Sequence, residues 1–344
     1  MSPVLKSVAR QLRAVWMLLL VGVVLSIASP VFLTSTNLLN VGLATSVVAL
    51  LAVGQTYVII LAEIDLSVGA TLGFTAVVTA LVLRDHGLLP ALASGLGVGA
   101  VVGLVNGLLV TRTRMPSFIA TLAMLSILSG MSLQLTDGNP VAAGDYDFQG
   151  IGQEYVAGIP LPVWLMLAGY AVFGVLLART GFGRFVYATG DNLEAARLSG
   201  IRTQRIKILA FVISGLLSAV GGFILTARLS TAEPTAGTGL ELESIAAVII
   251  GGTSLAGGRG KLIGTLIGAL VLGVIDNGMN LLDVSPFLQS VVKGVVILLA
   301  VFLDRNVDAL RAMVAWRKPP LPAEPPATDT APTSATVPAT RHTP

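Results

Sequence analysis

Four ionisable side chains lie in or directly beside long apolar runs of this sequence, and they are Glu63, Asp65, Asp276 and Lys293. A charge inside a hydrocarbon layer is costly, so each of them predicts either an ion-binding group or a contact for a polar solute. For Lys293 the structural alternatives are an ion pair with Asp276 or a side chain that extends toward the membrane surface. The chemistry indicated is the binding and passage of a small polar species.

Uncharged hydrogen-bonding side chains accompany these charges at Gln55, Ser67 and Asn106. Such groups suit a neutral, hydroxyl-rich solute better than an ion, although each of them can equally bond a neighbouring helix. Asp65 and Ser67 also lie where they would cap the helix that follows them, and capping and contact with solute carry equal weight here. The candidates for a solute pathway are Gln55, Asp65, Ser67, Asn106 and Lys293.

Composition excludes several other classes of chemistry. The sequence has no Cys and only two His residues, so it offers no disulfide, no thiolate metal site and no His cluster for a catalytic metal. The remaining Ser and Asp residues have no base beside them, so no catalytic site is expected. Basic residues fall between apolar runs and form no patch for nucleic acid.

The segment GGRGKL at 257–262 looks at first like a phosphate-binding P-loop. Leu255 and Leu262 stand where that motif requires Gly and Ser or Thr. A tight glycine turn between apolar segments is therefore the better interpretation. If ATP drives this protein, another chain must bind the nucleotide.

The elements that must position these side chains are membrane-spanning helices. Hydrophobic residues make up 54% of the 344 residues, charged residues make up 11%, and the mean hydropathy is +0.86, which predicts an all-α polytopic membrane protein. About ten apolar stretches are candidate spans. The eighth is short and rich in glycine, which also fits a half-helix or a re-entrant hairpin. The stretches are 15–33, 41–61, 67–83, 91–111, 117–135, 162–178, 208–227, 244–258, 262–282 and 286–303.

The distribution of basic residues predicts that both termini are cytoplasmic. The outward stretches 136–161 and 230–243 contain acidic residues and no Lys or Arg, whereas the inward loops are basic except near residue 64. The Pro-rich C-terminal segment cannot bury enough apolar surface to fold and is expected to be largely disordered. We predict a cytoplasmic segment at 1–14, a transmembrane domain at 15–303 with a cytoplasmic loop at 179–207, and a cytoplasmic tail at 304–344.

The cytoplasmic loop contains the signal of a short polar helix, GDNLEAARLSGI at 190–201. Asp191 or Asn192 is placed to accept hydrogen bonds from first-turn amides, and Gly200 lies where a left-handed C-cap would end the helix after about two turns. A helix this short is marginal in water, so it must pack either on this chain or in a groove of a partner. The side chains available to a partner are Leu193, Ala196, Arg197 and Leu198.

This stretch resembles the coupling loop of bacterial ABC importer permeases, because Glu194, Ala195 and Ala196, then three residues, then Gly200 match its EAA-type spacing. The chain is similar to the monosaccharide permeases of that class, such as those for ribose, xylose and arabinose. The similarity covers most of residues 40–303. The segments that carry it are GQTYVIILAEIDLSVGA at 54–70, GLVNGLLV from 103, PSFIATLAML from 116 and LELESIAAVIIGGTSLAGGRGKLIGTLIGALVLGVI at 240–275.

The resemblance implies the permease subunit of an ABC importer, which would move a monosaccharide or a similar small polar solute across a bacterial inner membrane by alternating access. It implies three partners: a second permease copy in a homodimer, a cytoplasmic ATPase that binds ATP and Mg²⁺, and a periplasmic sugar-binding protein. The residues expected to couple to the ATPase are Asn192, Glu194, Ala195, Ala196, Arg197, Ser199 and Gly200, and Glu241 and Glu243 are candidates for docking the sugar-binding protein.

Two points remain open at the level of sequence. Ala62 and Glu63 stand where this family has Gly-Gly before Ile-Asp-Leu-Ser, which implies different helix packing or pathway width here. The alternative function is a secondary transporter coupled to H⁺ or Na⁺, for which Glu63, Asp65, Asp276 and Lys293 are the available ionisable set. A capped cytoplasmic helix flanked by bases has no clear role in such a carrier.

Overall fold

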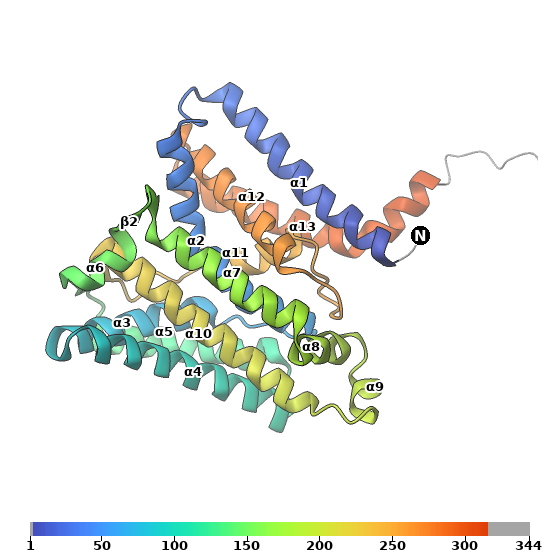
Figure 1. Cartoon of the computed structure of the whole chain (residues 1–344), viewed down its shortest axis with the longest axis horizontal. Helices are drawn as coiled ribbons and strands as arrows, with labels where there is room; N and C mark the ends of the chain where they lie inside the picture. The colour runs from blue at the N-terminus through green and yellow to red at the C-terminus, as the bar shows by residue number, and fades with distance from the viewer. Residues whose placement is uncertain (1–2, 316–344) are drawn as a thin grey trace, which may run out of the picture. The chain divides into compact units, whose positions relative to one another are not determined.

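The computed structural model describes residues 3–315, with side chains described for 14–299, 301 and 302. It is predominantly helical (Figure 1), and seven of its helices are long and apolar enough to cross a membrane. The long helices are α1 (Pro3–Ala28), α2 (Ser35–Ile60), α3 (Val68–His86), α4 (Leu88–Arg112), α5 (Ser117–Thr136), α7 (Leu161–Arg179), α10 (Thr203–Leu229), α12 (Leu262–Leu281) and α13 (Pro286–Ala315).

Shorter elements connect these helices. The short helices are α6 (Tyr146–Gln153), α8 (Gly181–Asp191), α9 (Leu193–Leu198) and α11 (Leu240–Ile250). Two antiparallel pairs of two-residue strands lie between them. β1 (Val141–Ala142) pairs with β4 (Thr231–Ala232), with Val141 opposite Ala232, and β2 (Tyr155–Val156) pairs with β3 (Ile159–Pro160). The first pair ties the α5–α6 connection to the segment after α10.

Every expected span overlaps a helix, although the helix ends differ from the predicted limits by up to several residues. The helix predicted over 244–258 begins earlier, at Leu240, and ends at Ile250, because Gly251 closes it and Gly252 adopts a φ of +89°, a left-handed conformation that favours glycine. At 11 residues α11 is shorter than a full membrane span, and the half-helix and re-entrant hairpin interpretations of this segment both stay predictions. The boundary predicted at 14/15 falls inside α1, and the one predicted at 303/304 falls inside α13. Residues 316–344 of the predicted tail lie outside the described part of the chain.

Helix α2 forms the centre of the membrane domain. It is apolar on all sides, and 83% of its span is buried, which is typical of a helix enclosed by other helices. Helices α7, α10, α11 and α12 all pack against it. Among its buried side chains are Leu50, Leu51, Val53, Tyr57 and Ile59, which belong to the main hydrophobic core.

A stripe of glycines lets α4 and α10 approach closely. Gly95, Gly99, Gly103 and Gly107 recur every four residues and therefore share one face of α4. A Cβ atom on Gly103 would collide with the carbonyl oxygen of Phe211, which is backbone of α10. Small residues at such spacing allow helix backbones to pack directly, which is the main attraction between helices in a lipid medium.

We expect Gly103→Leu to force α4 away from α10 and to lower the free energy of unfolding by about 3 kcal/mol, the upper end of the usual effect of overpacking a core. The measurement is the thermal unfolding midpoint of the purified protein in detergent. Gly97→Leu on the same helix is the matched control, because a Cβ there meets nothing within 4 Å. Equal midpoints for the two variants would show that the stripe is not a packing contact.

Candidate functional site

Helix α9 forms where the sequence predicts a short capped helix. The side chain of Asn192, not Asp191, provides the N-cap, because its Oδ1 accepts a hydrogen bond from the Ala195 amide at 3.0 Å. At the other end the Ile201 amide donates to the Ala196 carbonyl at 3.1 Å, and Gly200 adopts a φ of +82°. This is the Schellman arrangement that a glycine after a helix favours. Both caps come from within residues 192–201, so the helix ends are fixed locally.

The two faces of α9 have different surroundings. Ala196 is 5% exposed and packs on this chain, whereas Leu193 is 46% exposed and Leu198 is 82% exposed. The other expected coupling residues, Asn192, Glu194, Ala195, Arg197, Ser199 and Gly200, are all exposed. The helix therefore rests on this chain through Ala196 and presents two leucines and both charges outward. A pair of exposed leucines beside a charged pair is suited to contact with another protein.

A backbone junction connects the α8–α9 corner to the end of α2. The Gly258 amide donates to the Ile60 carbonyl at 2.8 Å, and Gly190 packs so closely on the same carbonyl that a Cβ atom would collide with it. Tyr187 of α8 donates its hydroxyl hydrogen to the Gly260 carbonyl at 2.7 Å. Burial raises the pKa of Tyr187 to about 12, so this donor keeps its proton at physiological pH. The glycine turn predicted at 257–262 thus connects α2 and α8 by one hydrogen bond to each.

The turn after α2 contains Ala62 and Glu63 in place of the expected pair of glycines. Ala62 adopts a φ of +58°, a conformation that favours glycine, and Glu63 forms an ion pair with Lys207 at the start of α10. The two side chains are only 13% and 15% exposed, so solvent screens this pair weakly. The pair joins the α2–α3 turn to the segment that follows α9.

The turn continues into a buried cluster around Asp65. The Asp65 carboxylate accepts hydrogen bonds from the Ser67 amide at 3.0 Å, from the Ser67 hydroxyl at 2.7 Å and from the Ser214 hydroxyl at 3.0 Å. Asn106 donates to the Ser67 hydroxyl oxygen at 2.8 Å, and the Gln55 side chain donates to the Asp65 carbonyl. All five side chains are at most 2% exposed. Four of the five pathway candidates therefore lie in one network between helices.

Neither predicted side chain caps the first turn of α3. Asp65 accepts from the amide of Ser67, the N-cap residue itself, and the Ser67 side chain makes no cap hydrogen bond and donates to Asp65 instead. The other exposed backbone amides are satisfied from α5, because Ile64 donates to the Ser117 hydroxyl and Leu66 to the Thr121 hydroxyl. Irregular backbone within a membrane domain requires such partners.

Lys293 lies in a second ionic group, away from this cluster. Its ammonium is 2.7 Å from Glu243 Oε1 and 3.1 Å from Asp276 Oδ2, so it joins α11, α12 and α13. Glu241 accepts a hydrogen bond from the Gly239 amide at 3.2 Å at the start of α11. The ion pair with Asp276 was anticipated as an alternative, and Glu243, a docking candidate, is an additional partner.

Sequence reasoning missed three contributors to these sites. Ser214 and Lys207 belong to α10, and their partners are distant by 149 and 144 positions along the chain. Ser214 is a hydroxyl side chain in an apolar stretch of α10. The third contributor is Gly190, which lies at the start of the GDNLEAARLSGI stretch and has no side chain to indicate a contact. Only the polarity of Ser214 in its apolar surroundings offered a hint.

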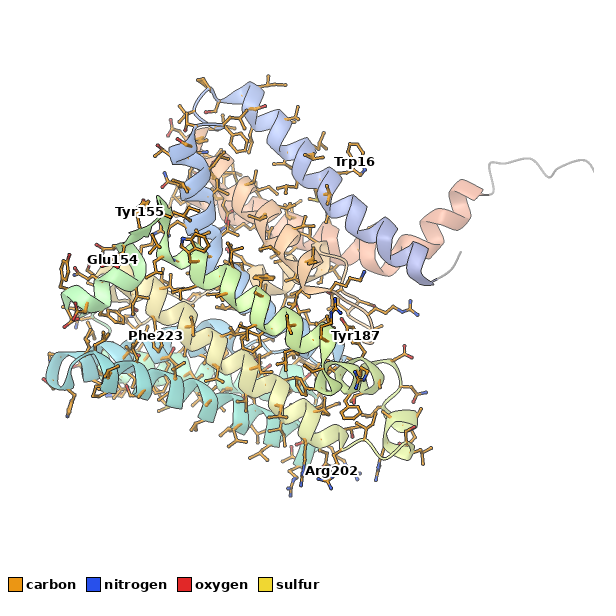
Figure 2. All side chains as sticks on the ribbon, in the orientation of Figure 1. Trp16, Glu154, Tyr155, Tyr187, Arg202 and Phe223 are labelled. Carbon is orange, nitrogen blue, oxygen red and sulfur yellow. The ribbon has the colours of Figure 1, made fainter. Side chains whose placement is uncertain are left out.

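The α8–α9 region and the segment around α6 lie at opposite ends of the helix bundle. Figure 2 shows Tyr187 and Arg202 near one end of α7 and α10, and Glu154 and Tyr155 near the other end. At that second end, Gln153 donates to the carbonyl of Ala227, near the end of α10. Helix α9 and the acidic segment around α6 therefore lie near opposite ends of α10.

Comparison with known proteins agrees with the resemblance. A family described as "Branched-chain amino acid transport system / permease component" matches residues 37–301. The ribose import permease protein RbsC of Bacillus subtilis (strain 168) is 48% identical over 295 residues, which cover 85% of this chain and 92% of the relative. RbsC of Escherichia coli (strain K12) is 47% identical over 296 residues, with coverage of 84% and 92%.

A further relative is the L-arabinose transport system permease protein AraH of Escherichia coli (strain K12), which is 40% identical over 277 residues, covering 80% of this chain and 84% of the relative. No solved structure matches the chain.

Proposed function

The chain belongs to the family described as the permease component of branched-chain amino acid transport systems, and we propose that it is the membrane-spanning subunit of an ABC importer for a monosaccharide. The observation that carries this proposal is α9, a helix capped at both ends, seated through Ala196 and otherwise exposed. Such a helix has no clear role in a self-contained carrier. An importer that takes its energy from a separate ATPase requires one.

The partners proposed are a second copy of the permease, a cytoplasmic ATPase and a periplasmic sugar-binding protein. ATP and Mg²⁺ are assigned to the ATPase, because the glycine turn of this chain lacks the residues of a P-loop and is occupied in packing on α2 and α8. The location proposed is the bacterial inner membrane, with both termini in the cytoplasm. Docking of the sugar-binding protein at Glu241 and Glu243 stays a prediction.

The backbone junction suggests how movement of the ATPase reaches the membrane domain. When nucleotide binding closes the ATPase, α9 is displaced, and the packing of Gly190 on Ile60 passes this displacement to the end of α2. The Glu63–Lys207 ion pair makes the α2–α3 turn and the start of α10 move together. The two permease copies then rock between outward-open and inward-open states, with the free energy supplied by differential nucleotide binding.

The relatives favour a sugar as the solute. They are import permeases for ribose and L-arabinose, and the polar side chains near the spans of this chain are mostly amides and hydroxyls, which hydrogen-bond hydroxyl groups. We assign Gln55, Asp65, Ser67 and Asn106 to the wall of the pathway. Lys293 is assigned to the link between α11, α12 and α13.

The experiment is uptake of labelled ribose, L-arabinose and D-xylose by the native host with and without this permease. We expect deletion to abolish high-affinity uptake of at least one of these sugars. A protonophore should leave that uptake intact while cellular ATP is maintained, because the proton gradient does not drive it. Uptake that collapses with the proton gradient at constant ATP would instead identify an ion-coupled carrier.

A further inference from the structure

The carboxyl group of Asp65 is buried in its cluster without a cationic side chain from the described part of the chain beside it. Its carboxylate is 2% exposed, and all three hydrogen bonds that it accepts come from neutral groups of Ser67 and Ser214. Among the side chains that the structure describes, no Lys, Arg or His forms an ion pair with it. Lys207 of α10 is already paired with Glu63, which lies two residues before Asp65 in the turn.

Two further atoms of the cluster lack partners, and both are acceptors. The side-chain oxygens of Gln55 and Asn106 have no hydrogen-bond donor, although both residues are 0% exposed. The amide nitrogens of the same side chains are used, one by the Asp65 carbonyl and the other by the Ser67 hydroxyl. Two kinds of partner are therefore missing from the cluster. Among the described side chains, the carboxylate has no positive charge beside it, and each of the two amide oxygens has no hydrogen-bond donor.

A water molecule, a proton or a metal cation can act as the missing partner, and they differ in which of the carboxylate and the two amide oxygens they satisfy. A water molecule can donate to both amide oxygens but leaves the buried charge in place, which is costly in an apolar medium. A proton on Asp65 removes the charge but can satisfy only one of the two oxygens. A metal cation accepts oxygen ligands from several directions and offsets the charge as well. One carboxylate balances one positive charge, so the cation is monovalent.

The backbone around the cluster is irregular. Residues 61–67 interrupt the helical path between α2 and α3, and discontinuous helices of this kind are found at the Na⁺ sites of membrane transporters. From Thr203 to Ser214 helix α10 rises about 16 Å, and the side chains of the cluster are at most 2% exposed. Bulk water therefore cannot screen the carboxylate.

We propose that the Asp65 cluster is a binding site for a monovalent metal cation of the Na⁺ class, held between α2, α3, α4 and α10 with the oxygens of Asp65, Gln55 and Asn106 as ligands. The cation is a resident part of the fold and fixes the α2–α3 turn against α4 and α10. It does not drive transport. The inference stands on this cluster alone, so it does not depend on the identity of the solute or of the ATPase.

The experiment compares thermal unfolding of the purified full-length protein in NaCl and in N-methyl-D-glucamine chloride at equal ionic strength. We expect the midpoint to rise by about 5 °C in NaCl and to saturate with Na⁺ concentration, because a ligand that binds only the folded state stabilises it by mass action. Asp65→Asn should abolish this rise. Asp85→Asn is the matched control, since it removes an exposed carboxylate at the far end of α3 and should keep the rise.

Retention of ²²Na⁺ by the wild-type protein after rapid desalting provides a second readout that does not depend on the folding of a variant. We expect about one ion per chain, displaced by excess unlabelled Na⁺ and not by N-methyl-D-glucamine. Identical unfolding midpoints in the two salts together with no retained ²²Na⁺ would overturn the proposal. This assay contains no ATPase, so its failure is distinct from a failure of the proposed transport function.

Discussion

Replacing Leu198 by aspartate is expected to abolish solute uptake while the permease remains folded and inserted. Leu198 is 82% exposed at the end of α9, so the substitution removes no internal contact. At a protein interface, burying a new charge next to apolar groups costs about 2–4 kcal/mol, which corresponds to at least about a 30-fold loss of ATPase affinity. The measurement is uptake by cells that produce equal amounts of the wild-type and variant proteins.

Tyr146→Asp is the matched control for this prediction. Tyr146 is 81% exposed on α6, at the other end of the bundle from α9 (Figure 1), so the substitution adds the same charge on a similarly exposed side chain. We expect it to leave ATPase binding unchanged. Normal uptake by Leu198→Asp at normal protein levels would mean that α9 does not contact the ATPase through this face.

Reversing the charge of Glu63 is expected to have the second large effect. Glu63→Lys places two ammonium groups together in a site where the original side chains are 13% and 15% exposed. Removing one partner from a largely buried ion pair lowers the free energy of unfolding by about 3 kcal/mol, because the other charge stays desolvated. Since this pair joins the α2–α3 turn to α10, uptake per molecule of ATP hydrolysed should also fall.

The decisive comparison is the double variant Glu63→Lys, Lys207→Glu, which restores an ion pair in reversed order. We expect it to recover most of the stability and of the coupling ratio, measured by thermal unfolding and by uptake against ATP hydrolysis in proteoliposomes. Asp85→Lys in the exposed Arg84–Asp85 pair is the control and should change neither quantity. Additive losses in the double variant would show that the two side chains are not coupled.

The parts of the site that the sequence predicts well are those whose contacts are local. The caps of α9 come from Asn192 and Gly200, both within a few residues of the helix, so side-chain type and spacing were sufficient. The Asp65 cluster is different, because Ser214 is 149 positions away. Spacing along a helix places a residue on a face but does not identify the residue on the helix opposite.

Helix α11 shows the same limit for the fold. Hydropathy alone extends an apolar segment to residue 258, because Gly251 and Gly252 count as neutral. The helix ends at Ile250, since Gly251 packs directly on Gly264 at the start of α12 and Gly252 has a positive φ. A contact between two glycine backbones does not change the hydropathy of the sequence. The end of this helix therefore could not be predicted from hydropathy.

The most direct test of the central claim is affinity purification of the tagged permease from its native membrane, followed by identification of the bound proteins by mass spectrometry. Wild type is compared with Glu194→Arg, Gly200→Pro, which disrupts α9 outside the spanning helices. The account predicts that an ABC ATPase co-purifies with wild type, about one per permease chain, and is lost from the variant. Absence of any ATPase from folded wild-type protein would contradict the assignment of this chain as an ABC importer permease.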